Sequence, residues 1–197
     1  MQTKEVREAI LDATDNLLAR YGYKKMTIDD LAQEVGIGKG SVYLHFSSKE
    51  EIVLSHIDRI IERLKEKLAE IVKSNIPPPE KLKKMLSTRV LFRFDSVQHY
   101  TQSLNEMLSV IRPQLLIRRK NYFSEEAGIF AEVIEQGQKS KVFGPGNALE
   151  LAETCLLATN SLLPYSLSAA ELGERNDLEN KMKRLADLLV NGILQQK

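Results

Sequence analysis

Cysteine, proline and glycine are all scarce in this chain, and each scarcity excludes a class of protein. The 197 residues include a single cysteine, Cys155, which excludes an intrachain disulfide and leaves no cysteine cluster for zinc. Six prolines and ten glycines are too few for an all-β protein with many tight turns. The three histidines share no metal-ligand spacing. We therefore expect no metal site and no cofactor.

The sequence also lacks a large net charge and a long apolar run. Lys and Arg number 28 and Asp and Glu number 27, so the formal charge of +1 excludes a histone-like protein held to nucleic acid by bulk charge. No stretch approaches the roughly 20 apolar residues that span a bilayer. The first residues lack the apolar core of a signal peptide. We expect a folded cytoplasmic protein that has no membrane partner.

Apolar residues recur at the spacing of amphipathic helices along the whole chain, and no alternating strand pattern is present. The sequence therefore predicts an all-α fold. Pro113 suits a helix start, and Pro164 predicts a kink or an early helix end. The triplet Pro77-Pro78-Pro79 marks the clearest break. The predicted helices cover a first segment that ends near residues 21–22, then 28–35, 39–46, 49–72, 80–94, 102–110, 113–140, 147–167 and 177–195.

Residues 27–46 combine two short predicted helices with a glycine-containing turn between them. The spacing of Thr27 and Asp30 is typical of a helix N-cap with an acidic residue three positions later. The turn Gly36-Ile37-Gly38 follows, and two short helices joined in this way form a helix-turn-helix. At 100° per residue, Val42 and Phe46 of the second helix point inward together. That helix is a rod of roughly 12 Å, which fits a major groove.

The outward face of the second helix has the chemistry that DNA binding requires. Ser41 is placed to reach a base edge, and Leu44 is placed to pack against a thymine methyl. The small Gly40 allows the helix N-terminus to approach a phosphate. Charge alone does not indicate DNA, because residues 1–50 contain seven basic and eight acidic side chains. The candidate DNA-binding residues, including those expected to hold phosphates, are Thr27, Lys39, Gly40, Ser41, Tyr43, Leu44, His45 and Lys49.

Residues 26–52 resemble the DNA-binding segment of tetracycline-repressor (TetR) family regulators. The residues that carry the resemblance follow the pattern Thr-Ile…Ala…Gly-Ile…Lys-Gly…Tyr-x-His-Phe-x-x-Lys-Glu. This pattern is specific because the turn, the second helix and the cap of the next helix occur in one register. Gly38 departs from it, since such proteins often have Ser or Ala there. The resemblance implies a homodimeric, ligand-responsive transcriptional regulator, most often a repressor. Residues 1–48 would form the helix-turn-helix DNA-binding domain and 49–197 a helical ligand-binding and dimerisation domain, linked by the helix 49–72.

The resemblance also implies three partners: a double-stranded DNA operator, a small-molecule effector and a second copy of the chain. A cavity between helices is a regular site for a small molecule, and whether Arg118 and Arg119 face the ligand or solvent stays open. Apolar arcs on the last two predicted helices are wide enough to pack on the chain's own core and on a symmetry mate. The effector candidates are Phe92, Tyr100, Leu104, Met107, Arg119, Tyr122, Phe123 and Asn160. The dimer candidates are Leu156, Thr159, Leu163, Leu185 and Leu189.

Two other classes of function stay open at this point. An enzyme is the first, although no Ser/His/Asp or Cys/His set is visible and no catalytic residue is predicted. The glycines in residues 36–41 lack the G-x-x-x-x-G-K-[ST] spacing of a phosphate-binding loop. A helical adaptor that has lost DNA binding is the second class. The intact Lys39, Tyr43 and Lys49 argue against it.

Overall fold

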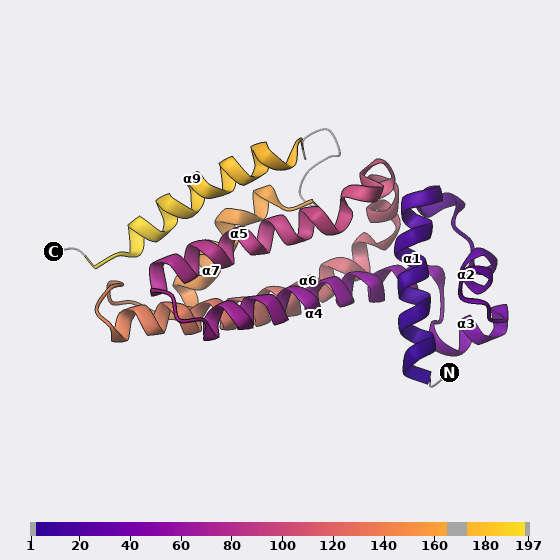
Figure 1. The fold of residues 1–197 in the computed structure, drawn as a ribbon, viewed down its shortest axis with the longest axis horizontal. Helices are drawn as coiled ribbons and strands as arrows, with labels where there is room; N and C mark the ends of the chain where they lie inside the picture. Colours follow the sequence, from indigo (N-terminus) through magenta and orange to yellow (C-terminus); the bar gives the residue numbers. More distant parts are fainter. Residues whose placement is uncertain (1–2, 165–172, 196–197) are drawn as a thin grey trace. The chain divides into compact units, whose positions relative to one another are not determined.

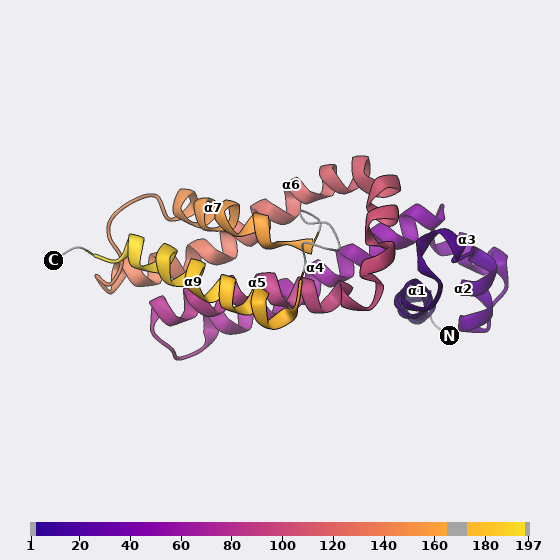
Figure 2. The ribbon, with the colours of Figure 1, turned by 90° about the horizontal axis from the view of Figure 1, so that it is seen from above.

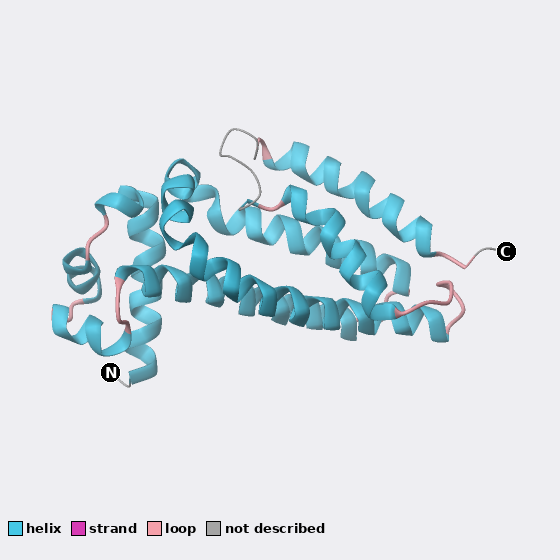
Figure 3. Cartoon of the chain, turned by 180° about the vertical axis from the view of Figure 1, so that it is seen from behind, coloured by secondary structure: helices cyan, strands magenta, loops and turns pink. Residues whose placement is uncertain are grey.

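The computed structural model describes residues 3–164 and 173–195, and these residues are helical apart from short connections (Figure 3). The predicted all-α fold is confirmed, because the described part contains no strand and only an isolated bridge between Phe143 and Leu194. The helices are α1 (Thr3–Lys25), α2 (Ile28–Val35), α3 (Lys39–His45), α4 (Lys49–Lys73), α5 (Pro78–Val97), η1 (Gln98–Tyr100), α6 (Thr101–Lys139), α7 (Ala148–Thr159), η2 (Asn160–Leu162) and α9 (Arg175–Ile193) (Figure 1).

Contacts between residues divide the chain into two compact units. The first unit consists of Met1–Ile60 and Val97–Ile117, and the second consists of Ile61–Ser96 and Arg118–Lys197. Helices α4 and α6 each contribute residues to both units. The division into functional domains after residue 48 stays a prediction.

The first unit forms around α1, which packs against α2 and against η1. Apolar side chains of α1 lie in its core, among them Ile10 and Leu17. The helical geometry of α1 is interrupted at Gly22, whose φ is 73° and ψ is 170°. A Cβ at this position would also lie 3.0 Å from the Cβ of Ser103. Two constraints therefore require glycine at residue 22, namely its positive φ and the close approach of α6.

The predicted N-cap at Thr27 is confirmed, and Ser48 forms a second N-cap in the first unit. Thr27 accepts a hydrogen bond from the backbone N–H of Asp30, and the Asp30 carboxylate accepts one from the backbone N–H of Thr27. Ser48 accepts a hydrogen bond from the backbone N–H of Glu51 at 3.1 Å, at the start of α4. Caps of this kind satisfy donors that the first helical turn leaves unpaired. They fix where α2 and α4 begin.

The second unit is a helical bundle to which α4, α5, α6, α7 and α9 contribute (Figure 2). Lys81 of α5 joins its neighbours by donating to the carbonyl of Val72 on α4 and to the side chain of Gln136 on α6. An ion pair of 2.8 Å between Lys83 and Asp187 ties α5 to α9. These contacts position the helices around a core that is mostly apolar.

Close packing also determines the path of the chain after the end of α6. The ring of Phe143 lies against Gly137, where a Cβ would come within 2.1 Å of the ring. Phe143 is buried, and its backbone bridges to Leu194 beyond α9. Only glycine leaves space for this ring, so Gly137 sets how the chain turns back after α6.

Several predicted helix boundaries differ from the structure. The expected break at Pro113 is wrong, because α6 runs without interruption from Thr101 to Lys139. Proline costs one backbone hydrogen bond inside a helix, and residues 112–114 are exposed, so water can bind the carbonyl that loses its helical donor. The second short helix ends at His45, with Phe46 as its C-cap. The early end before Pro164 is confirmed, since α7 stops at Thr159 and η2 follows, while residues 165–167 lie outside the described part.

Candidate nucleic-acid interface

The turn between α2 and α3 has the geometry of a helix-turn-helix. Gly36 adopts left-handed backbone angles of 74° and 36°, and its N–H donates to carbonyls of the last turn of α2. Ile37 is half-buried in the turn, and its N–H donates to the carbonyl of Ala32 at 2.9 Å. Glycine adopts such angles without a steric penalty. The local sequence therefore determines the angle at which α3 leaves α2.

Helix α3 is anchored by one face and exposed on the other. Val42 is fully buried and Phe46 is 3% exposed, as the periodicity predicted. The guanidinium of Arg7 on α1 lies 5.0 Å from the centre of the Phe46 ring. On the opposite face Leu44 is 85% exposed and Tyr43 is 50% exposed. An exposed leucine beside a half-exposed tyrosine on an anchored helix is available for contact with a large partner.

The remaining candidates on α3 lie around this exposed face. Gly40 is exposed, and a Cβ there would meet nothing within 4 Å, so the backbone is open to solvent at this point. Ser41 and His45 are half-buried at its edges. The exposed residues therefore include both small and large side chains within two helical turns.

Lys39 begins α3 and is held by α2. Its ammonium donates to Asp29 at 2.8 Å, and this carboxylate raises the pKa of Lys39 above its ordinary value. The lysine therefore stays charged at neutral pH. An ammonium has three donors, so Lys39 can keep Asp29 and bind a phosphate oxygen as well.

Lys49 contacts other residues of the chain, whereas the sequence indicated only a contact with DNA. Its ammonium donates to the carbonyl of Met26 at 2.8 Å and lies 4.3 Å from the centre of the Tyr23 ring. Partial burial lowers the pKa of Lys49. The Tyr23 hydroxyl in turn donates to Glu50 at 3.0 Å. Lys49 therefore ties the end of α1 to the start of α4, and its contact with phosphate stays a prediction.

Thr27 is engaged in its cap as a donor and as an acceptor. Its hydroxyl donates to Asp30 at 2.7 Å and accepts from the Asp30 N–H at 3.1 Å. A phosphate contact would have to compete with Asp30 for the hydroxyl proton. The capping role is present in the structure, and the DNA contact stays a prediction.

The predicted effector residues divide between the two units. Three of them, Tyr100, Leu104 and Met107, are buried in the first unit. The other five belong to the second unit, where all are half-buried; they are Phe92, Arg119, Tyr122, Phe123 and Asn160. The structure therefore does not gather the eight residues into a single compact unit.

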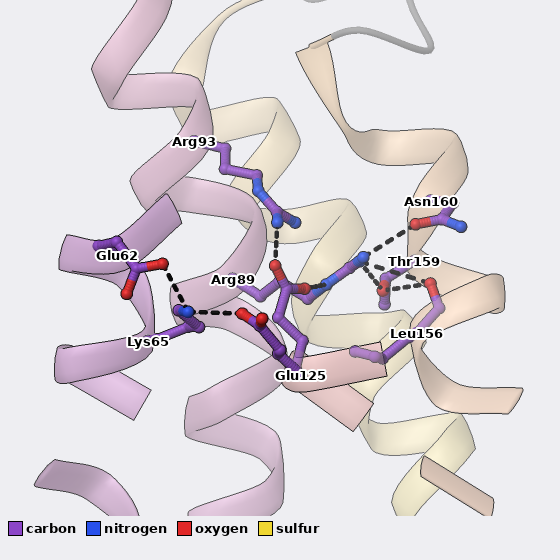
Figure 4. A network of polar contacts seen from close by, with 9 residues as sticks. Glu62, Lys65, Arg89, Arg93, Glu125, Leu156, Thr159 and Asn160 are labelled. Atoms are coloured by element: carbon purple, nitrogen blue, oxygen red, sulfur yellow. Dashed lines mark hydrogen bonds and ion pairs between the residues drawn. The ribbon is translucent and has the colours of Figure 1, made fainter. Parts of the chain in front are cut away.

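The sequence interpretation missed a buried polar network in the second unit (Figure 4). The Nε of Arg89 donates to Glu126 at 2.8 Å, and Arg93 donates to the other oxygen of the same carboxylate. Arg89 also donates to the Thr159 hydroxyl at 2.7 Å and to Asn160 at 2.9 Å. Both arginines are on α5, one turn apart. Two cationic residues at this spacing within an apolar stripe were the signal in the sequence for a buried polar network.

The predicted dimer residues on α7 are already used inside the chain. Leu156, Thr159 and Leu163 are fully buried, and Thr159 is bonded to Arg89. Leu185 and Leu189 of α9 are half-buried. The exposed leucines of these two helices are instead Leu149, Leu157 and Leu188, at 45%, 62% and 69%. Any interface on this surface has to use these exposed side chains.

The fold and the anchored, exposed α3 define a helix-turn-helix protein of the class of transcriptional regulators. Residues 10–55 match the sequence model of the family described as bacterial regulatory proteins, tetR family. The matched segment contains the whole motif of residues 26–52, which resembles the same family.

Relatives match the chain over different lengths. The HTH-type transcriptional regulator YerO of Bacillus subtilis is 37% identical over 87 residues, which are 43% of this chain and only 30% of that protein. The fatty acid metabolism regulator protein of Bacillus subtilis is 24% identical over 188 residues, 93% of each chain. A crystal structure of a transcriptional regulator from Cytophaga hutchinsonii is 26% identical with a TM-score of 0.80, over 96% of this chain and 98% of that one. The likeness thus extends over both units.

Two features are absent from the residues that the structure describes. Within them, no helix combines the length and apolarity needed to cross a membrane. In the same residues, no group of three or more His, Cys, Asp or Glu side chains is arranged to hold a metal ion.

Proposed function

We propose that this protein is a dimeric repressor that binds a pseudo-palindromic DNA operator and releases it when a small molecule binds. The observation that carries the proposal is α3, which is anchored by Val42 and Phe46 and presents Leu44 and Tyr43 to solvent. The similarity to transcriptional regulators over both units supports it. Acting on DNA would place the protein in the cytoplasm, and no catalytic role is needed.

In the proposed complex, each subunit inserts α3 into a major groove. Ser41 and Leu44 read base edges, while Lys39, Tyr43 and His45 hold phosphates on either side. Two-fold symmetry then requires half-sites about one helical turn apart, roughly 34–36 Å. A repressor of this kind prevents transcription by occupying its operator.

Helix α4 provides the proposed route for release. Its first turn contacts Tyr23 at the end of α1 through Glu50 and the carbonyl of Met26 through Lys49, and from Ile61 onward it belongs to the second unit. An effector that binds the two states of the second unit with different affinity would change the equilibrium between DNA-binding and released forms. Fatty acids are the first compounds to test, because a full-length relative is named a fatty acid metabolism regulator protein.

The test is fluorescence anisotropy of the purified protein on DNA from upstream of its own gene. A random duplex serves as the control, and both are titrated at two salt concentrations. We expect salt-sensitive binding to the upstream DNA well above the random duplex. Absence of binding to either DNA at low salt would reject the proposal and favour the enzyme or adaptor alternatives.

Two substitutions separate phosphate contacts from base readout. Lys39→Ala should weaken binding to both duplexes alike and reduce the salt slope by about one. Leu44→Ala should leave binding to the random duplex unchanged and weaken operator binding about fivefold, because a lost base contact costs roughly 1 kcal/mol or more. Ile117→Ala is the matched control, since Ile117 is 70% exposed on α6. Equal loss on both duplexes for Leu44→Ala would contradict its role as a base reader.

A further inference from the structure

The first unit contains a cavity that the DNA-binding role does not use. It has a volume of about 510 Å³ and lies between the end of α1, the turn η1 and the start of α6. Its walls include Arg20, Lys24 and Lys25 of α1 and Tyr100 and Glu106 from the other side. One water occupies only about 30 Å³, so the cavity has room for a small organic molecule.

The charges of the cavity wall favour an anion. Among the residues that line the cavity, the cations Arg20, Lys24 and Lys25 outnumber the single carboxylate, which belongs to Glu106. Lys24 pairs with Glu106 at 3.0 Å, and Arg20 pairs at 3.4 Å with Glu34 outside the cavity. Lys25 is exposed and has no ion pair within the described part of the chain. The wall therefore keeps a positive excess after its own pairs are formed.

A buried donor in the same wall points independently to a ligand. Tyr100 is 3% exposed, and its hydroxyl has no hydrogen-bond partner among the described residues. A buried polar group without a partner is unfavourable, and a bound acceptor that reaches the hydroxyl would remove this cost. Burial, and then the nearby Asp15 carboxylate, raise the pKa of Tyr100, so its hydroxyl stays protonated and can donate.

We propose that this cavity binds a small organic anion whose carboxylate or phosphate group accepts from Tyr100 and pairs with Lys25. Charge-assisted hydrogen bonds to such a group are stronger than neutral ones. The cationic wall and the buried phenol together define the ligand class, and the cavity volume accommodates its organic part.

The site is connected to the helix-turn-helix through its own walls. Lys25 lies two residues before Thr27, which caps α2. The Tyr100 ring lies 6.4 Å from the ring of His56 on α4, and His56 is 3.5 Å from Asp15 on α1. A ligand that bridges α1 and η1 changes the energy of the contacts among α1, η1 and α4. Binding of the ligand in the cavity therefore changes the affinity for the operator. This regulatory consequence rests on the proposed function, whereas anion binding does not.

Isothermal titration calorimetry of the full chain tests binding without DNA. The probes are phenyl phosphate and benzoate, with benzyl alcohol as the uncharged control and inorganic phosphate as the bare ion. We expect both organic anions to bind, inorganic phosphate to bind more weakly and benzyl alcohol not to bind. Inorganic phosphate binding as tightly as phenyl phosphate would overturn the organic part of the ligand class.

Three variants locate the site. Lys25→Gln and Tyr100→Phe should each raise the dissociation constant of phenyl phosphate about tenfold, the loss expected for one hydrogen bond to a charged group. Lys73→Gln, which removes an exposed lysine at the end of α4, should leave it unchanged. Failure of both organic anions to bind, or equal binding by all variants, would overturn the proposal.

Anisotropy on the operator at constant ionic strength tests the regulatory consequence. Phenyl phosphate should change operator affinity for the unmodified chain but not for Tyr100→Phe. An unchanged affinity at saturation, measured on a protein that binds both operator and anion, would overturn the regulation while leaving the DNA-binding function standing.

Discussion

At the scale of single residues, neighbouring positions of α3 have opposite tasks. Val42 contributes to the core and Leu44, two positions later, contributes almost nothing to it, because 85% of its surface remains exposed. A buried valine resists substitution through lost packing. An exposed leucine can be replaced with little loss of stability, so the residue at this position can match the DNA that it contacts. Different residues of one short helix therefore determine stability and operator preference.

Asp30 makes the stability of the first unit depend on pH. Its carboxylate accepts from the Thr27 hydroxyl and from the Thr27 N–H, and these bonds lower the pKa of Asp30 below its ordinary value of 3.8. A carboxyl with a lower pKa in the folded state stabilises that state above its unfolded pKa and loses this effect as the pH falls through the folded one. Asp30→Ala should therefore lower the melting temperature at pH 7.

The difference in melting temperature between Asp30→Ala and the unmodified chain should become smaller below about pH 4. Circular dichroism measures both melting curves. Glu132→Ala is the control, since Glu132 is an exposed carboxylate with no ion pair in the described part of α6. A difference that stays constant down to pH 2 would show that the Asp30 carboxylate does not act through ionisation.

At the scale of helices, local patterns in the sequence predicted α2, α3 and the caps, because caps and turns depend on residues three or four positions apart. The helix-turn-helix could be predicted for the same reason. The continuity of α6 through Pro113 could not be predicted, because the local pattern around a proline does not distinguish a helix start from a proline inside a continuous helix. The network of Arg89 and Glu126 was also missed, because its members are 37 residues apart.

Removal of Arg89 should destabilise the second unit strongly. Arg89 is 1% exposed and joins α5 to Glu126 of α6 and to Thr159 at the end of α7. Arg89→Leu leaves a buried carboxylate and a hydroxyl with fewer partners, and breaking a buried pair in this way costs about 3–5 kcal/mol. Urea unfolding should show this loss.

Lys139→Gln is the control for Arg89→Leu, because it breaks a surface ion pair with Glu135 on α6 that is 3.8 Å long. Exposed pairs contribute about 0–1 kcal/mol. If the two variants were equally stable, the buried network would have no role in holding α5, α6 and α7 together.

At the scale of the whole molecule, the exposed leucines of α7 and α9 predict the dimer surface. Leu157 and Leu188 are 62% and 69% exposed, whereas half of the described leucines are buried. Leu157→Asp combined with Leu188→Asp should give a monomer in analytical ultracentrifugation and weaken operator binding at least tenfold, because one subunit reads only one half-site. Ile117→Asp, at an equally exposed residue of the first unit, should remain dimeric.

The first unit is assembled from two separate stretches of chain, and this affects how the protein is made. Met1–Ile60 emerges from the ribosome before Val97–Ile117, which supplies the buried Tyr100 and Leu104. At roughly 5–20 residues per second, translation needs several more seconds to deliver that second stretch. Until then α1 exposes apolar surface that η1 and the start of α6 later cover. Chaperones that hold nascent chains therefore have a defined period in which to act on this protein.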